Sequence, residues 1–441
     1  MVYDMTKGSS LKAIVSMTIP LMIGNVFQQF YGMADTFIVG HFLGQNALGA
    51  VGSTASIYSF IWWFTLGITG GFAVLLAQDF GAGNYKRLRE RLCLSITLAG
   101  IITLITTIVS VSLVGKLLIW MNTPAELYDS AYQYIVVILS GLFSTTAYSM
   151  SAAVLRAIGD SKTPLYFLII SSVLNIILDI VFIRYLNLGT AGAAGATVIS
   201  QAVSGILCII YIYRKFEILH LSKDDWKIRK GEPATLLKIG LPLGINGCIT
   251  ASGIMILQIA VNGYGAEVVS AFATASKVEQ LANQIVAAFS ITMINFAGQN
   301  MGAKNYSNLK KGVKDGFFLM LFTAIILSTV LILFGGKLAG LFIDNPTANV
   351  IAYASQYLKI SGTFFVFLGG IYVFRSVAQG MGDSKIPIIN GIVESGSRII
   401  WAVYLINWGS FKQLCFAGPT TWLVAAIITF ILCQRKLKKL V

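Results

Sequence analysis

Residues 77–88 read AQDFGAGNYKRL, and residues 298–309 read GQNMGAKNYSNL. Six positions agree at an offset of 221 residues: Gln78, Gly81, Ala82, Asn84, Tyr85 and Leu88 against Gln299, Gly302, Ala303, Asn305, Tyr306 and Leu309. Two further matches keep the same order and nearly the same offset, namely GDSKTP at 159–164 with GDSKIP at 382–387, and IPL at 19–21 with LPL at 241–243. Such self-similarity predicts that the chain contains two copies of one structural unit.

The sequence between these motifs has the composition of a membrane protein. Of its 441 residues 56% are hydrophobic and only 11% are charged, and the mean hydropathy is +0.77. A soluble protein has about 25% charged residues, and a soluble chain of this length would need several charged domain surfaces. The 43 glycines show no collagen-like period, which excludes a fibrous protein.

Twelve apolar runs are each long enough to form a membrane helix, which needs about 20 residues. The runs lie near 13–38, 50–77, 92–114, 131–155, 164–184, 190–213, 239–262, 269–296, 315–334, 350–374, 386–408 and 413–433. No segment alternates in polarity as a β-barrel strand does. The sequence therefore predicts an all-α integral membrane protein, with twelve transmembrane helices in two parallel six-helix repeats. The predicted domains are an N-terminal lobe at 1–213, a cytoplasmic linker at 214–238 and a C-terminal lobe at 239–441.

The net charge of +14 is an orientation signal. Most lysines and arginines lie in alternate gaps between the runs, and the opposite gaps carry only Lys116, Arg184, Lys337 and Lys412. The positive-inside rule then places both termini in the cytoplasm, and no nucleic-acid partner is expected. The five cysteines form no CxxC pair and only two histidines are present, so neither a disulfide framework nor a metal site is predicted.

The motifs resemble those of the multidrug and toxic compound extrusion (MATE) family. The resemblance rests on Pro20 in the first run, AQDFGAGNYKRLRE, LRAIGDSKTP, and the echoes AGQNMGAKNY and QGMGDSKIP in the second half. It covers nearly the whole chain. It implies secondary efflux of amphipathic, often cationic compounds in exchange for inward H⁺ or Na⁺.

Two carboxylates inside the runs are the leading candidates for a functional site, because charges in the membrane are costly. Asp35 shares a helix face with Gln28 and Tyr31, and Asp179 lies one turn after Asn175. A desolvated carboxylate can take a proton near neutral pH, and one surrounded by oxygen ligands can hold Na⁺. A purely structural role is the alternative: Asp35 at the outer interface, and Asp179 in an interhelical hydrogen bond.

Within the family, these residues resemble the N-terminal site of the DinF-like branch. The resemblance implies that Asp35 is a protonation switch with Asn175, Asp179 and Thr197 as polar partners, together forming the ion-coupling site. It also implies that Gln28, Tyr31, Asp35 and Asn175 line the substrate cavity. The sequence departs from the NorM-like branch, since runs 239–262 and 350–374 contain no carboxylate.

A second set of charges lies in the C-terminal half, where Lys277, Glu279, Glu394 and Arg398 form a possible polar site. Glu394 and Arg398 have the i, i+4 spacing of an intrahelical ion pair. Arg398 occupies the repeat position of Asn175, so a role in a cavity stays open. Lys277 and Glu279 should face different directions on one helix.

The predicted function is that of an ion-coupled multidrug antiporter of a bacterial cytoplasmic membrane. Walker A, HExxH and GxSxG patterns are absent, so no enzyme activity, catalytic residue or cofactor is expected besides the transported H⁺ or Na⁺. The expected partners are small amphipathic substrates and the lipid bilayer, and the expected state is a monomer. The alternatives are a flippase for a lipid-linked oligosaccharide or other amphipathic lipid, and an intramembrane enzyme acting on lipids.

Overall fold

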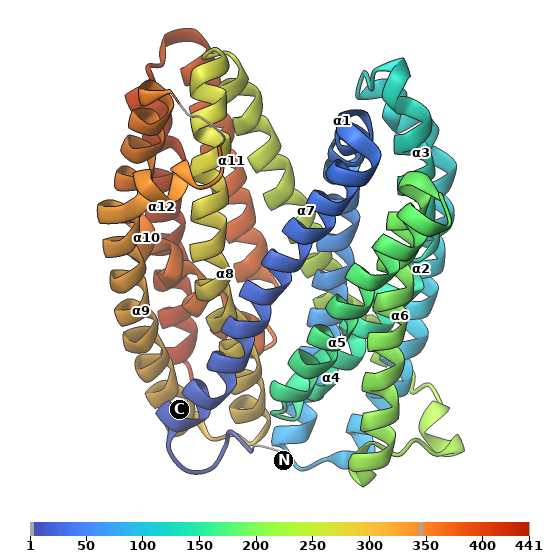
Figure 1. Cartoon of the computed structure of the whole chain (residues 1–441). Helices are drawn as coiled ribbons and strands as arrows, with labels where there is room; N and C mark the ends of the chain where they lie inside the picture. The colour runs from blue at the N-terminus through green and yellow to red at the C-terminus, as the bar shows by residue number, and fades with distance from the viewer. Residues whose placement is uncertain (1–3, 344–346, 441) are drawn as a thin grey trace. The chain divides into compact units, whose positions relative to one another are not determined.

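A computed structural model describes residues 4–343 and 347–440, and their regular secondary structure consists of helices alone (Figure 1). The first half contains α1 (Ser10–Gly81), α2 (Tyr85–Trp120), α3 (Ala125–Ser140), α4 (Leu142–Ala157), α5 (Lys162–Ile180), the π-helical turn η1 (Val181–Tyr185) and α6 (Gly189–Lys215). The 3₁₀ turns η2 (Glu217–Leu219) and η3 (Lys223–Trp226) follow. The second half contains α7 (Glu232–Asn262), α8 (Ala266–Gly302), α9 (Tyr306–Gly340), α10 (Ala348–Gly380), α11 (Lys385–Trp408) and α12 (Phe411–Lys438).

Nine helices in the described residues are long and apolar enough to cross a membrane. The number is ten if α3 and α4, which meet at a bend of 45°, together form one broken span. Helix α1 has 72 residues and would measure about 108 Å if it were straight, whereas the hydrocarbon core of a bilayer is about 30 Å thick. It therefore corresponds to two predicted runs, 13–38 and 50–77. Helix α11 is less apolar because it carries charged and polar residues along its length. With α1 counted twice and α11 included, the twelve predicted runs are all helical.

The backbone repeats along with the sequence. Gly44 breaks α1 with φ of 83° and ψ of −177°, and Gly265, at the repeat offset of 221, precedes α8 with φ of 87° and ψ of 166°. A side chain would strain this left-handed conformation, which glycine adopts freely. The first two spans of one repeat therefore correspond to α7 and α8 of the other, and the predicted fold class is confirmed.

The described chain divides into two compact units whose bounds differ from the predicted domains. The first unit is built chiefly from Ile23–Gly244, and the second joins Met5–Met22 to the chain from Ile245 onward. Each repeat thus contributes the start of its first helix to the other unit. The two division points are 222 residues apart, and each follows a helix proline, Pro20 or Pro242, by two residues. The outermost predicted domain residues, 1–3 and 441, lie outside the described residues.

The repeated motifs are helix-capping turns. Asn84 accepts a hydrogen bond from the Arg87 N–H at 3.1 Å and caps α2, and Asn305 does the same for the Asn308 N–H at 3.1 Å and caps α9. A side-chain oxygen at this position satisfies one of the N–H groups that a helix start leaves free. The AQDFGAGNYKRL motif and its echo therefore have a local structural role.

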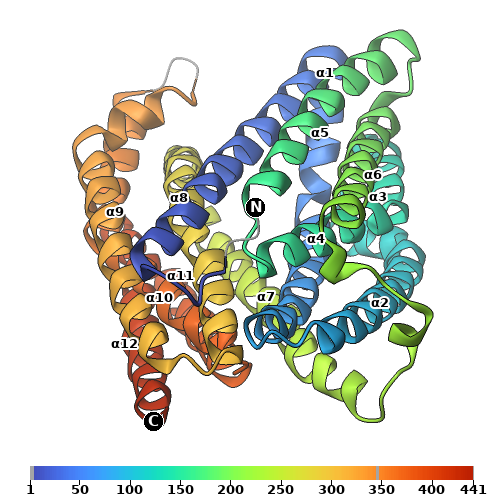
Figure 2. The same cartoon turned by 90° about the horizontal axis from the view of Figure 1, so that it is seen from below.

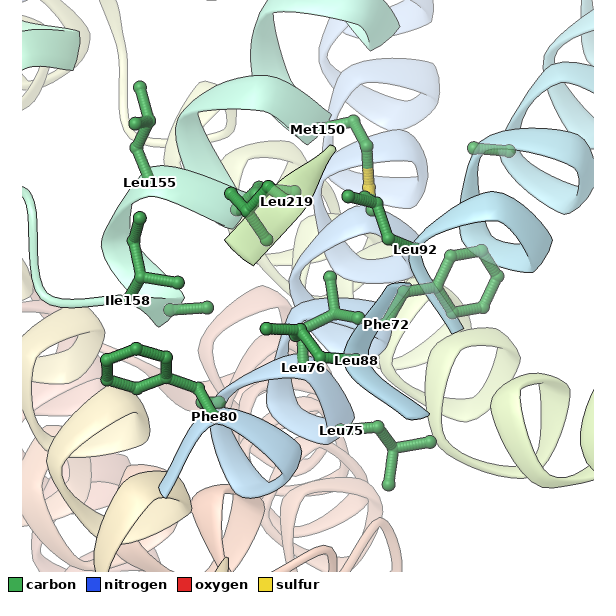
Figure 3. Packing of buried hydrophobic residues seen from close by; sticks show 14 of the residues in the cluster. Phe72, Leu75, Leu76, Phe80, Leu88, Leu92, Met150, Leu155, Ile158 and Leu219 are labelled. Carbon is green, nitrogen blue, oxygen red and sulfur yellow. The ribbon is translucent and has the colours of Figure 1, made fainter. Parts of the chain in front are cut away.

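The linker that follows α6 is folded onto the first unit. Arg89 of α2 bonds to Asp225 of η3 at 3.2 Å. Figure 2 shows the segment between α6 and α7 passing beside α2. Leu219 of η2 is 3% exposed and packs into an apolar cluster with Leu88, Leu92 and Met150 (Figure 3). Burial of this kind removes apolar surface from water, so the linker is a structural part of the unit.

Candidate ion-coupling site

Asp35 and Asp179 meet inside the first unit. Asp35 lies on the first half of α1 and Asp179 at the end of α5, and their carboxyl groups are within hydrogen-bonding reach of each other. Asp179 is fully buried. Two ionised carboxylates at this separation repel strongly, so a proton or a cation between them is needed to stabilise the pair.

Two predicted ion-coupling partners, Asn175 and Thr197, and the predicted substrate-binding residue Tyr31 surround this carboxyl pair. The Asn175 amide group is oriented so that its nitrogen donates to Asp179 Oδ2 at 2.9 Å. Its oxygen then accepts from the Thr197 N–H at 3.1 Å. The Tyr31 hydroxyl lies near the Thr197 side chain. The structure therefore brings together Tyr31, Asp35, Asn175, Asp179 and Thr197. Gln28 lies about one turn before Tyr31 on α1 and is half-buried.

Local helix geometry positions Asp179. Helix α5 ends one residue later, and the chain continues as the π-helical turn η1. Single π turns are rare and are frequent at functional sites because they change the direction in which side chains point. One oxygen of each carboxyl group, Asp35 Oδ1 and Asp179 Oδ1, is buried and accepts no hydrogen bond from the described protein groups. These two oxygens are free to bind a proton or a small cation.

Two tyrosines near the pair were not predicted as site residues. Tyr58, on the second half of α1, and Tyr134, on α3, both lie within electrostatic range of Asp35. Tyr134 also packs next to a cluster containing Ile38 and Ile183. Neither position has a spacing relation to Asp35 in the sequence, because each lies on a different span. Only the assembled helices bring them close.

In the second unit, the charges of α11 form a buried network. Arg398 Nη2 donates to Glu394 Oε2 at 3.2 Å, so the predicted intrahelical ion pair is present. Asn390 Nδ2 donates to Glu394 Oε1 at 2.5 Å, and Thr429 of α12 donates to Asn390 Oδ1 at 2.7 Å. The sequence pattern showed the pair but gave no sign of the α12 contact.

The other two predicted charges of this half, Lys277 and Glu279, both lie on α8 but face different directions. Glu279 of α8 accepts hydrogen bonds from Tyr357 at 2.7 Å and Ser361 at 3.1 Å, both on α10, and lies within electrostatic range of Arg398. Lys277 is exposed, and the described residues provide no ion pair for it. The structure thus joins Glu279, Glu394 and Arg398 into one polar region and leaves Lys277 outside it.

This arrangement does not resemble a metal centre or a basic pocket. Among the described residues no group of three or more histidine, cysteine, aspartate or glutamate side chains could hold a metal ion. Arg398, which a pyrophosphate-binding cavity would require, is already paired with Glu394. The chemistry available is reversible binding of a proton or small cation by carboxyl groups.

Comparison with known proteins agrees with the repeat. The MatE family model matches twice, at residues 20–181 and 242–404, which lie 222 residues apart at their starts. The probable multidrug resistance protein YpnP of Bacillus subtilis is 29% identical over 384 residues, covering 86% of this chain and 84% of that protein. The probable multidrug resistance protein NorM of Thermotoga maritima is 28% identical over 425 residues, covering 95% of this chain and 89% of that protein.

Solved structures share the fold across the whole chain. An outward-facing multidrug resistance MATE family transporter of the MOP superfamily superposes with a TM-score of 0.91 at 23% identity, covering 99% of this chain and 98% of that one. A MOP superfamily transporter from Pyrococcus furiosus gives the same TM-score, identity and coverage. Because the family model matches most of the sequence in two segments that coincide with the two repeats, the chain belongs to the MatE family.

Proposed function

We propose that this protein is a secondary active multidrug efflux transporter that exchanges inward H⁺ or Na⁺ for amphipathic, often cationic organic compounds. Family membership supports transport, and the names of its relatives, among them the multidrug export protein MepA of Staphylococcus saprophyticus, support drug export. We further propose that it acts as a monomer without cofactor or enzyme activity, in a bacterial cytoplasmic membrane with both termini in the cytoplasm.

The observation that carries the proposal is the carboxyl pair formed by the fully buried Asp179 and the half-buried Asp35. A structural role would require only one carboxyl group hydrogen-bonded to Asn175, and a second carboxylate close beside it would be destabilising. An ion-coupling site, in contrast, must bind and release a positive charge during each transport cycle, and two neighbouring carboxyl groups can do this. The pair therefore favours an ion-coupling site over a packing feature.

The geometry favours a proton as the coupling ion. When the two carboxyl groups are in direct hydrogen-bonding reach, one proton satisfies both of them. A Na⁺ ion would have to separate the carboxyl groups to enter between them. The same carboxyl oxygens could then coordinate the Na⁺ ion. Na⁺ coupling is therefore the alternative to proton coupling, and the experiment below distinguishes the two.

Coupling requires that the ion and the substrate bind the site unequally. In the proposed cycle, a cationic substrate binds near Gln28, Tyr31, Asp35 and Asn175 while the pair is ionised. Protonation removes the negative charge that attracts the substrate and so favours its release on the outer side. The two units then rock to return the site to the cytoplasm, and each ligand shifts this equilibrium only by its differential affinity for the two states.

The test is ethidium efflux from proteoliposomes under an imposed pH gradient or an imposed Na⁺ gradient. Asp35→Asn and Asp179→Asn should each abolish gradient-driven efflux while reconstituting normally. Asp224→Asn serves as the matched control, because the Asp224 side chain is 81% exposed in the linker. Efflux driven by the Na⁺ gradient alone would reject the proton, and normal efflux in either site variant would reject the site.

A further inference from the structure

A groove lies on the second unit, where the start of α9 faces the end of α12. Its volume is about 480 Å³, and its described lining includes three lysines, Lys310, Lys314 and Lys438, and no carboxylate. Below the lysines the walls are aromatic, with Phe318 55% exposed and Phe430 45% exposed. The groove thus combines a positive rim with an apolar floor.

This groove lies at a helix end near the membrane surface. The lysines are within the first three turns of α9 and at the last residue of α12, and the phenylalanines follow deeper along the same helices. Met5 and Leu440 lie at the same end, because the Met5 carbonyl accepts from Asn308 Nδ2 and the Leu440 carbonyl from Lys310 Nζ. Positive residues at one end of the spans mark the cytoplasmic side.

The corresponding surface of the first unit is covered by the protein itself. Leu92 occupies the repeat position of Val313, which lines the groove, and Tyr211 that of Gln434, which also lines it. In the first unit Leu92 belongs to the apolar cluster that contains Phe216 and Leu219, and the Tyr211 and Phe216 rings lie 5.7 Å apart. The cavity left between α2 and the linker measures about 20 Å³.

The second repeat therefore exposes a surface that the first repeat fills with aromatic and aliphatic side chains. Exposed phenylalanines at membrane depth do not need a protein partner, since acyl chains are as apolar as a protein core. The lysines above them would be stabilised by an anion, because three like charges along one rim repel each other. A molecule that carries a phosphate at the membrane surface and an acyl chain below it meets both requirements.

We propose that this groove binds an anionic phospholipid of the cytoplasmic leaflet. Its phosphate contacts Lys310, Lys314 and Lys438, and one acyl chain lies along Phe318 and Phe430. Basic pockets on the cytoplasmic side of membrane helices bind anionic headgroups in this way. Lys310 retains N–H donors for the lipid beyond the one that bonds to Leu440, since an ammonium group has three. The site is independent of the ion-coupling residues, which lie in the first unit.

The experiment is native mass spectrometry of the full-length protein with an equimolar mixture of phosphatidylglycerol and phosphatidylcholine that share the same acyl chains. Wild type should retain phosphatidylglycerol preferentially. The triple variant Lys310→Gln, Lys314→Gln, Lys438→Gln should reduce that preference by about tenfold or more, because it removes the three positive charges that attract an anionic headgroup. The control variant Lys304→Gln, Lys311→Gln, Lys439→Gln changes three exposed lysines that do not line the groove, and it should keep the preference.

A second arm distinguishes a lipid site from a simple anion site. Phe318→Ala with Phe430→Ala should weaken phosphatidylglycerol retention, and excess inorganic phosphate should not displace the lipid from wild type. About half of each residue is exposed, and both line the groove surface and lie outside the packed core, so a melting temperature close to that of wild type is expected. Equal retention of the two lipids by wild type, or an unchanged preference in the lysine triple variant, would overturn the proposal. Displacement by phosphate together with no effect of the phenylalanine changes would also overturn it.

Discussion

Thr18 Oγ1 donates a hydrogen bond to Thr292 Oγ1 at 2.9 Å where α1 meets α8 in the second unit. The repeat positions of these two residues are Gly240 and Gly71 in the first unit, where α7 meets α1. A Cβ atom added to Gly71 would lie 2.6 Å from Gly240 Cα, so the two backbones touch. The same helix crossing is thus made by a hydrogen bond in one unit and by glycine contact in the other, both of which are typical of membrane helix packing.

Gly71→Ala should destabilise the protein, because the new methyl group meets backbone atoms of Gly240 and Ile239 that cannot move independently of α7. Overpacking of this kind costs about 1–3 kcal/mol. Thermal unfolding in detergent, followed by tryptophan fluorescence, measures the change. The adjacent Gly70→Ala is the matched control, because its Cβ would meet no atom within 4 Å. Equal melting temperatures for the two variants would contradict the close contact.

Thr18→Val and Thr292→Val test the equivalent crossing. Each change removes a hydroxyl group and keeps a side chain of similar size, so it loses the interhelical hydrogen bond together with that hydroxyl's bond inside its own helix, to Ile14 O or Ala288 O. Such bonds in membranes contribute about 0.6 kcal/mol on average. Each single change already breaks this bond, so the double variant should be more stable than the sum of the two single effects predicts, and a double-mutant cycle gives the coupling energy. A coupling energy indistinguishable from zero would mean that the 2.9 Å contact adds no stability.

Arg91 holds the linker to the first unit. Its Nη1 donates to Asp79 Oδ2 at 2.9 Å and its Nε to Glu232 Oε2 at 3.0 Å, and the side chain is 6% exposed. Arg91→Met removes the nearest cation from the buried Asp79 carboxylate and one of two cations from the half-buried Glu232. Arg87, 4.0 Å from Asp79 and 2.9 Å from Glu232, replaces it only in part, so the expected loss is about 3 kcal/mol. Unfolding measurements should show this loss, and Lys227→Gln, which breaks an exposed pair with Asp224, should leave the stability unchanged. A small effect of Arg91→Met would show that the linker is held mainly by its apolar residues.

Hydropathy and the repeated motifs were sufficient to predict the spans, because both report properties of single segments. They could not show that residues 5–22 and the start of α7 belong to opposite units, since hydropathy gives the depth of a helix but not its neighbours. The same limit applies to the ion-coupling site. Asn175 and Asp179 share a helix face in the sequence, whereas the approach of Tyr134 to Asp35 depends on the packing of different spans.

Asp383, in the turn between α10 and α11, should make stability depend on pH. Burial opposes ionisation, but the Lys436 ammonium at 2.6 Å and the Ile386 and Lys385 N–H groups outweigh it and hold the pKa of Asp383 below its ordinary value. A carboxyl group with a lowered pKa stabilises the folded state above its unfolded pKa, and that contribution is lost as pH falls through the folded pKa.

The melting temperature of wild type should therefore exceed that of Asp383→Asn at neutral pH. The difference should shrink as the pH drops below about 4, where the unfolded carboxyl group is protonated. Lys436→Met is the companion variant, because it removes the main source of the lowered pKa while keeping Asp383. A difference between wild type and Asp383→Asn that is the same at every pH would show that the effect is one of packing.

The carboxyl pair itself predicts opposite effects on stability and on transport. In Asp179→Asn the amide can donate to Asp35, so one negative charge remains where ionised wild type has two. At alkaline pH, where a shared proton is lost, this variant should melt at a higher temperature than wild type because the repulsion between the carboxylates is absent. Gradient-driven efflux should nevertheless be lost, since the pair can no longer take up and release a proton. A variant that is destabilised at every pH would show instead that Asp179 is needed for packing between α5 and its neighbours.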